Sequence, residues 1–191
     1  MTIKGKIKSI KTSIEGKPVY GNNDGDIGRL IEKYLKEEGW PVQSGAGPDI
    51  LIYGIEIKSR RIDATSNQTV GRMDIDDIIT TDYDNSPIKA KIQYQIRVYH
   101  DGEKIVDVQY YDFTDPFIQD NLKEAYETAR DKLVKGWDKS WVPGTTWGAF
   151  EEDKNQPGSY QFRINRASYG KIENMTKDAF YNIFEVEHDN H

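Results

Sequence analysis

The segment over residues 48–58 constrains the fold of this chain more than any other. It reads Pro-Asp-Ile-Leu-Ile-Tyr-Gly-Ile-Glu-Ile-Lys: an apolar run, a Tyr-Gly pair suited to a tight turn, and then alternating apolar and charged residues. Alternation with a period of two is typical of a β-strand with one buried face, so Ile55 and Ile57 should point into a core. Glu56 and Lys58 should then share the opposite face. The segment predicts a β-hairpin that presents an acid and an amine side by side.

A second carboxylate precedes this pair. Asp49 ends the first arm of the expected hairpin, seven residues before Glu56. The two carboxylates and the carbonyl oxygen of Ile57 would offer Mg²⁺ the hard oxygen ligands that it prefers. Lys58 would add a charged amine beside the ion, a combination suited to a phosphodiester substrate. The alternative also stays open: Asp49 as a turn residue, and Glu56 with Lys58 as an exposed ion pair.

A helix is expected before the hairpin. It opens at Gly25-Asp26, runs to about Leu35, and has apolar residues at helical spacing: Ile27, Leu30, Ile31, Tyr34 and Leu35. Glu32 lies on the flank of this helix.

The order Gly-x-x-Gly-x-x-x-Glu on a helix, then Pro-Asp, then Glu-x-Lys on a strand, resembles the PD-(D/E)xK nucleases of the restriction-endonuclease-like fold. It is most similar to the branch containing the mismatch-repair nicking enzyme MutH and the related GATC-cutting restriction enzymes. In that branch the helix glutamate joins the active site. The resemblance therefore implies a catalytic quartet of Glu32, Asp49, Glu56 and Lys58. It also implies metal ligation by Asp49, Glu56, Ile57 and Glu32.

Residues 20–60 carry the specific match. One position departs from it: the branch has a lysine just before the first glycine of the helix motif, where this chain has Asp24. A basic contact to the DNA backbone is therefore missing or supplied elsewhere. A later helix to about Val134 and a strand over 160–164 are similar to the second half of the MutH-like fold.

The expected fold class is α/β, with a restriction-endonuclease-like core in which helices flank a central mixed β-sheet. The chain of 191 residues shows no internal repeat and no linker-like run, which favours one endonuclease domain over 1–191. Its catalytic half would span about 20–115. A helix, a loop and a DNA-recognition region would follow over about 116–191.

Composition narrows the chemistry and the location. The chain has no cysteine, which excludes disulfides, thiolate catalysis and a cysteine-built zinc site. No apolar stretch approaches the ~20 residues of a transmembrane helix, and the start lacks a signal-peptide core, so a cytoplasmic protein is expected. The net charge of −6 does not exclude a DNA partner, because a basic cleft can bind phosphates on an acidic protein. Arg60 and Arg61, directly after the hairpin motif, would line such a cleft.

Further DNA-contact candidates fall in three segments. Ser66, Asn67 and Gln68 form a polar stretch that would serve phosphates and base edges, or be a plain surface loop. Lys89 and Lys91 lie in an alternating segment over 88–99, expected to be one strand of a hairpin that turns at Asp101-Gly102. Its polar row would face either solvent or DNA. Arg163, Asn165 and Arg166 lie at the end of a later strand, where Arg reads guanine and Asn reads adenine.

Other elements follow from local signals. A short helix is expected over 74–79, and a longer one from Pro116 to about Lys135, stopped by Gly136. The tryptophans at 137, 141 and 147 are expected in a loop that forms a satellite core.

The sequence thus predicts a Mg²⁺-dependent, sequence-specific endonuclease acting on double-stranded DNA, with Mn²⁺ able to substitute. A structure-selective enzyme, such as a junction resolvase or repair nicking enzyme, would use the same quartet with fewer base contacts. A DNA-binding module without catalysis is the third hypothesis. A homodimer would cut both strands of a palindrome and a monomer would nick one, and both states stay open.

Overall fold

The computed structural model describes residues 2–45, 47–64, 68–165, 168 and 171. Its contacts divide the chain into two compact units, and the described residues of each come from two stretches of sequence. The first unit holds the described residues up to Ala64 and Tyr94–Asp112; the second holds those from Gln68 to Gln93 and from Phe113 onward. Each unit combines helices with one sheet, which confirms the α/β class. The restriction-endonuclease-like core and the single endonuclease domain stay predictions.

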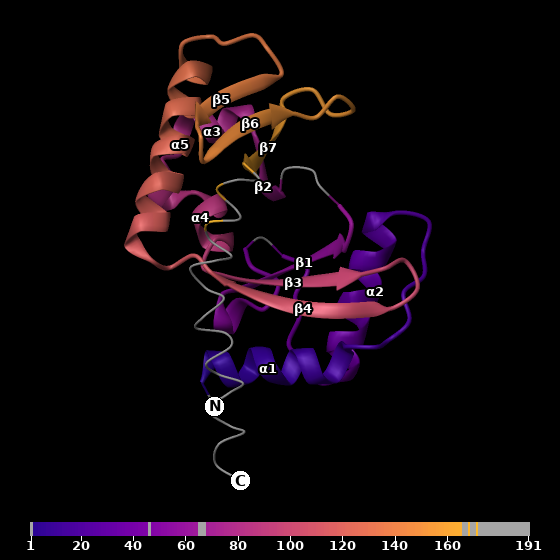
Figure 1. Ribbon diagram of the computed structural model, residues 1–191. Helices are drawn as coiled ribbons and strands as arrows, with labels where there is room; N and C mark the ends of the chain where they lie inside the picture. Colours follow the sequence, from indigo (N-terminus) through magenta and orange to yellow (C-terminus); the bar gives the residue numbers. More distant parts are fainter. Residues whose placement is uncertain (1, 46, 65–67, 166–167, 169–170, 172–191) are drawn as a thin grey trace. The chain divides into compact units, whose positions relative to one another are not determined.

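The first unit is built on a mixed sheet of three strands in the order β1-β3-β4 (Figure 1). β1 and β3 are parallel, whereas β3 and β4 form an antiparallel hairpin that turns at 101–102, as predicted. The turn closes through a hydrogen bond from the Asp101 N–H to the Lys104 carbonyl. The strands span Ile55–Arg61 (β1), Tyr94–His100 (β3) and Ile105–Asp112 (β4).

Two helices supply the core that covers one face of this sheet. They are α1 (Ile3–Ile14) and α2 (Asp24–Glu37), and α2 is the helix predicted upstream of the hairpin. The Asn23 side chain caps α2 by accepting from the Asp26 N–H. The fully buried residues of this core come from both helices and all three strands: Ile7, Ile10, Ile14, Ile31, Leu35, Ile55, Ile96, Val98 and Val108. α1 was not anticipated, although its isoleucines at 7, 10 and 14 have helical spacing.

The other face of the first sheet is polar, and part of it is buried. Residues opposite one another in the register share a face, so Glu56 lies beside Gln95 and Lys58 lies beside Arg97. Gln95 is fully buried and Arg97 is 2% exposed. The alternative that the polar row of this strand faces solvent is therefore wrong for Gln95 and Arg97 of β3.

The second unit packs a helix against an antiparallel sheet of order β2-β7-β6-β5 (Figure 1). The Tyr126 ring of α5 lies 5.3 Å from the Phe150 ring and 6.0 Å from the Phe162 ring. Its helices are α3 (Ile75–Thr80), α4 (Pro87–Lys91) and α5 (Pro116–Val134), with a 3₁₀ turn at Tyr83–Asn85. Its strands are β2 (Gln68–Asp74), β5 (Trp141–Thr145), β6 (Gly148–Glu152) and β7 (Ser159–Ile164).

The predicted strand over 88–99 is wrong in its first half. α4 begins there because Ser86 caps the Lys89 N–H and Pro87 occupies the first helical position, where a proline is favoured. Lys89 and Lys91 are therefore helical and do not continue the polar row of β3. Only residues from Tyr94 onward form the strand.

Two further expectations need correction. The tryptophan-rich segment forms a hairpin of β5 and β6, in which Trp147 is buried and Trp141 is exposed. Gln68 opens β2 and so does not lie in a plain surface loop, and the pairing register of β2 shifts between Thr69 and Gly71. A Cβ at Gly71 would lie 2.6 Å from the Ile88 side chain, so glycine permits close packing of α4 on β2.

The other predicted elements are confirmed. α3, α5 and β7 lie where the sequence placed them, and Gly136 follows α5 with a φ of 89°, as a helix stop requires. Within the described residues, no helix combines the length and the apolar character needed to cross a membrane.

Candidate active site

The hairpin that carries three of the four predicted catalytic residues, Asp49, Glu56 and Lys58, is short. Ile50 and Ile55 exchange backbone hydrogen bonds of 2.9 and 3.2 Å around a 3₁₀ turn at Leu51–Tyr53. Gly54 completes the turn with a φ of 64°, so the tight turn is confirmed. The first arm is a single bridge and not a strand. Pro48 has no N–H to donate there, which prevents the ladder from extending toward the chain start.

Asp49 is fixed against the edge of β1. Its Oδ2 accepts a 2.8 Å hydrogen bond from the Ile57 N–H. β3 pairs along one edge of β1, so this bond marks the opposite edge. In a strand the N–H and C=O of one residue point to the same side, so the Ile57 carbonyl also faces this edge. The structure thus brings together two oxygen donors that the sequence assigned to the metal.

Glu56 and Lys58 form an ion pair on the polar face of β1. The Lys58 Nζ lies 3.2 Å from the Glu56 Oε1. The Glu56 side chain is only 4% exposed and that of Lys58 is 30% exposed. The alternative of a fully exposed ion pair is therefore wrong. Burial of a carboxylate with an ammonium partner is costly for stability, and such pairs are often kept for a function.

Glu32 approaches β1 from α2. It lines a pocket of about 200 Å³, together with Gly28, Ile31, Ile57, Lys58 and Ser59. Burial raises the pKa of the Glu32 carboxyl, and the negative charge of Asp49 raises that pKa further. Lys36 and Arg29 act in the opposite direction. Glu32 is therefore close enough to Asp49 for their charges to interact.

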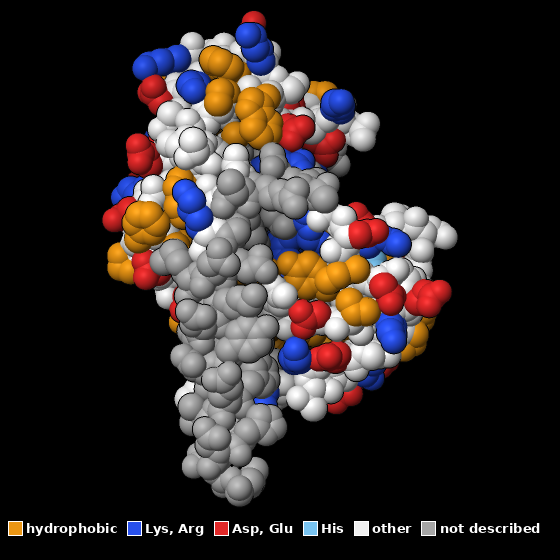
Figure 2. All heavy atoms as spheres, in the orientation of Figure 1, with side chains coloured by type: hydrophobic (Ala, Val, Ile, Leu, Met, Phe, Trp, Pro, Cys, Tyr) orange, Lys and Arg blue, Asp and Glu red, His pale blue; other side chains and the backbone are white. Residues whose placement is uncertain are grey.

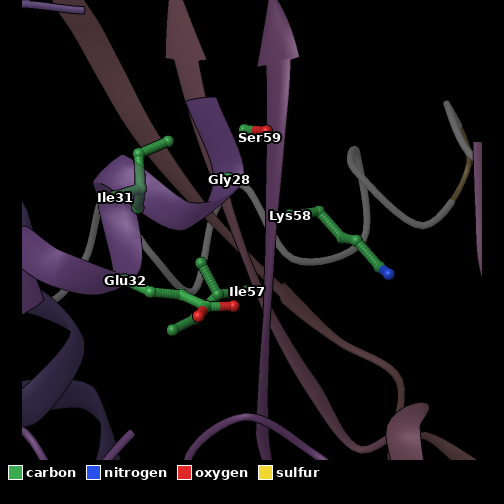
Figure 3. Close-up of a pocket in the computed structure, with 6 residues that line it drawn as sticks. All are labelled: Gly28, Ile31, Glu32, Ile57, Lys58 and Ser59. Atoms are coloured by element: carbon green, nitrogen blue, oxygen red, sulfur yellow. The ribbon is translucent and has the colours of Figure 1, made fainter. Parts of the chain in front are cut away.

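The quartet does not gather on one side of the strand. Figure 3 shows Glu32 and Ile57 on one side of β1, while the Lys58 ammonium extends to the other side. Glu56 belongs with Lys58 through their ion pair. Asp49 is held at the edge of β1 by its hydrogen bond with the Ile57 N–H. The prediction of one compact group thus needs revision, because Glu32 and Lys58 lie on opposite sides of β1.

This arrangement limits how a metal could be held. Among the described residues, no three acidic or histidine side chains form a group suited to one ion. Mg²⁺ is often bound by only one or two carboxylates and keeps several waters. Asp49 and the Ile57 carbonyl, with either Glu56 or Glu32 as the second carboxylate, fit that smaller requirement. The donor set is all oxygen, as Mg²⁺ or Mn²⁺ prefers.

The basic residues after the quartet lie in the same unit. Arg60 follows on the polar face of β1, two residues after Lys58. Arg61 forms a 2.9 Å ion pair with Asp63. Arg60 is thus the one of the two arginines that shares the face of Lys58.

The remaining DNA-contact candidates belong to the second unit. The Lys89 Nζ pairs with Asp84 at 2.8 Å, and the Arg163 Nη1 pairs with Glu151 at 3.2 Å. Asn165 is exposed just after β7. Lys91 closes α4, and Gln68 begins β2. Ser66, Asn67 and Arg166 lie outside the described residues. Figure 2 shows basic and acidic side chains interspersed over the visible surface of each unit.

Four residues that the sequence did not assign to the site lie around the quartet. Gly28 and Ser59 line the Glu32 pocket, and Gln95 and Arg97 lie beside the Glu56–Lys58 pair. Arg97 Nη2 donates a 3.2 Å hydrogen bond to Gln95 Oε1. For Gly28 a signal existed, because it is a helical glycine one turn before Glu32. For Arg97, the alternation of polar and apolar residues along β3 could be seen in the sequence, but the parallel pairing of β3 with β1 could not.

Comparison with known proteins adds no assignment to this site. The sequence matches no protein-family model and no curated protein. Function must therefore be argued from the residues and their geometry.

Proposed function

We propose that this chain is a Mg²⁺-dependent endonuclease that hydrolyses phosphodiester bonds in double-stranded DNA at specific sequences. One observation carries the proposal: the Asp49 carboxylate accepts a hydrogen bond from the N–H of Ile57, the residue of β1 that lies between the ion-paired Glu56 and Lys58. An acid ahead of the strand, followed on the strand by an acid and a lysine two residues apart, is the pattern of the PD-(D/E)xK motif. The chain would then belong with the restriction-endonuclease-like enzymes, near the MutH branch.

The metal would be held by Asp49 and the Ile57 carbonyl with Glu56 or Glu32. When bound, Mg²⁺ would polarise the phosphate and lower the pKa of a coordinated water. The hydrogen bond to Ile57 fixes the Asp49 carboxylate, so one Asp49 oxygen is positioned before any ligand arrives. Lys58 orients the attacking water and offsets negative charge that builds up on the phosphate. Glu56 holds the ammonium of Lys58 in place through their ion pair.

A structure-selective nuclease is the second candidate, and one observation favours it. Arg163, a residue proposed to read a base, is paired with Glu151 at 3.2 Å. A guanidinium engaged in this way has less capacity for a bidentate contact with guanine. Such an enzyme would use the same quartet and recognise the shape of branched or nicked DNA.

A cleavage assay separates these functions. Supercoiled plasmid, a linear duplex of known sequence and a four-way junction are incubated with the purified chain in Mg²⁺, Mn²⁺ or EDTA. Discrete fragments with defined ends support a sequence-specific enzyme, and junction cuts or nicks support the alternative. Intact DNA in every arm, with binding retained, would contradict both and leave a DNA-binding module. Sequencing of the fragment ends then gives the recognition site.

A further inference from the structure

Gln43 hydrogen-bonds both carbonyl groups of the Pro48-Asp49 pair. Its side-chain Nε2 donates to the Pro48 carbonyl at 2.9 Å, and its backbone N–H donates to the Asp49 carbonyl at 2.9 Å. Pro48 is buried and Gln43 is half-buried. The main chain on both sides of the Pro48-Asp49 peptide is therefore tied to one residue of the preceding loop.

The chain between Gln43 and Pro48 cannot hold this peptide by itself. Its sequence is Ser-Gly-Ala-Gly, and glycine loses more conformational freedom on folding than any other residue. The described residues between Gln43 and Ile50 belong to no helix or strand, so no ladder of hydrogen bonds fixes them. The side-chain bond from Gln43 to Pro48 spans this flexible stretch and restricts it where Asp49 begins.

The position of the Asp49 carboxylate follows from the position of its main chain. An aspartate side chain has only two rotatable bonds, and each prefers a few rotamers. Its Oδ2 can meet the Ile57 N–H at 2.8 Å only if the Asp49 main chain lies at the correct distance from the edge of β1. Gln43 fixes the main chain, and Ile57 then receives the carboxylate.

We infer that Gln43 is a positioning residue for Asp49: its amide sets the main chain so that one carboxylate oxygen meets Ile57 and the other is left for the metal. The role toward the metal rests on the proposed nuclease function, whereas the role toward Asp49 rests on the hydrogen bonds alone. Gln43 is neutral, so its replacement by another neutral residue leaves the charge of the site unchanged. A loss of metal affinity in such a variant comes from altered geometry, as is typical of residues that orient a metal ligand.

The Ile57 amide reports the position of Asp49 without any DNA. Gln43→Met keeps the length of the side chain and removes the donor. In the ¹⁵N-labelled variant the Ile57 amide proton should move upfield and exchange faster with solvent, because its hydrogen bond to Asp49 is weakened. Gln43→Glu places a carboxylate against the Pro48 carbonyl and should give at least as large a change. Both variants should keep dispersed spectra, since Gln43 is only half-buried.

Gln119 provides a matched control in the second unit. Its Nε2 donates to the carbonyls of Ile92 at 3.0 Å and Phe113 at 2.7 Å, so it also ties a side-chain amide to the main chain. Gln119→Met shows what the loss of such bonds does to stability alone, and it should leave the Ile57 amide unchanged. An Ile57 amide that keeps its wild-type shift in both Gln43 variants would overturn the inference. An equal change in Gln119→Met would overturn it as well.

The Mg²⁺ concentration that gives half of the maximal cleavage rate is the second readout. Gln43→Met should raise this concentration about 10-fold, the lower end of the effect expected for a residue that orients a metal ligand. Most of the rate should return at saturating Mg²⁺, because Glu56 and Lys58 are untouched. Gln119→Met should need the same Mg²⁺ concentration as the wild type. An unchanged requirement in Gln43→Met would reject the role toward the metal.

The two readouts distinguish failure of this inference from failure of the proposed function. If the wild type leaves every DNA substrate intact, the nuclease is rejected, and the Ile57 amide still decides whether Gln43 positions Asp49. If the wild type cleaves with Mg²⁺ and neither Gln43 variant alters the Ile57 amide, the nuclease stands and the positioning role is rejected.

Discussion

At the scale of single residues, Asp49 is the centre of the site. Its hydrogen bond to the Ile57 N–H places one carboxylate at the edge of β1, where Glu32 approaches from one face and the Glu56–Lys58 pair lies on the other. In the proposed enzyme each neighbour would have a separate role. Lys58 would serve the chemical step, whereas Glu32 would contribute negative charge beside the metal.

Lys58→Ala should lower the rate of DNA cleavage by at least about 100-fold, because charge stabilisation by one positioned group is typically worth that much. The fold should survive, since the Lys58 side chain is partly exposed. Single-turnover cleavage in Mg²⁺ measures the rate, and DNA affinity in Ca²⁺ should change little. Lys33→Ala, an exposed lysine of α2, is the control and should cleave normally. Near-normal cleavage by Lys58→Ala would remove Lys58 from the site.

Glu32→Gln should stabilise the chain at neutral pH when no metal is present. The folded pKa of Glu32 lies above its unfolded value near 4.5. The stability from its protonated form is complete below the unfolded pKa and is lost as pH rises through the folded pKa. Glutamine is uncharged throughout, so its advantage should be smallest below the unfolded pKa of glutamate and should grow as the pH rises through the folded pKa of Glu32. Thermal melting of both proteins between pH 4 and pH 7 in EDTA tests whether the substitution stabilises the fold. A Tm of Glu32→Gln below that of the wild type at pH 7 would contradict the prediction.

At the scale of elements, the tight turn between Asp49 and β1 aligns the site. Ile50 and Ile55 fix the hairpin with two backbone hydrogen bonds, and Gly54 makes the turn possible with its positive φ. A side chain is strained in that conformation. The position of the Asp49 carboxylate therefore depends on a glycine five residues away.

Gly54→Ala should destabilise the chain by roughly 1–2 kcal/mol, the cost of a left-handed conformation for an L-residue. Cleavage should fall as well, because the Asp49 carboxylate is displaced from the Ile57 N–H. Urea unfolding and single-turnover cleavage measure the two effects. Gly45→Ala is the matched control: its φ is ordinary, and a Cβ would meet the flexible end of Gln43. Equal stability of the two variants would show that the turn tolerates a side chain.

At the scale of the whole molecule, the proposed catalytic residues and the proposed recognition residues lie in different compact units. The first unit holds the quartet, on α2, on β1 and just before the tight turn, and the second holds Asn165 and Arg163 at the end of β7. Catalysis and base recognition should therefore respond to different substitutions. Because Arg163 is also paired with Glu151, Asn165 offers the cleaner test of recognition.

Asn165→Ala should relax site preference while leaving metal-dependent cleavage intact. A side chain that reads a base edge contributes about 1–3 kcal/mol of discrimination. Competition between the cognate site and sites with one altered base pair measures the loss. Asn155→Ala, at an exposed loop position of the same unit, serves as the control. Unchanged preference in Asn165→Ala would favour the structure-selective alternative.

Local signals were enough to predict several elements before the structure was known. The apolar spacing of α2, the turn at Gly54 and the stop of α5 at Gly136 all depend on residues close together in the chain. The sequence also determined that Ile55 faces the core and that Glu56 shares a face with Lys58. Periodicity along one strand is sufficient for both, because alternate residues of a strand point to opposite faces.

Only the tertiary structure decided what surrounds those residues. The parallel pairing of β1 with β3 brings Arg97 beside Lys58, and Glu56 on the same face is buried. α2 places Glu32 on the opposite side of β1 from Lys58. None of this follows from spacing, because the partners lie far apart in the chain. A one-dimensional pattern fixes the face on which a side chain lies. Burial, pKa and proximity to other charges depend on which distant elements pack against that face.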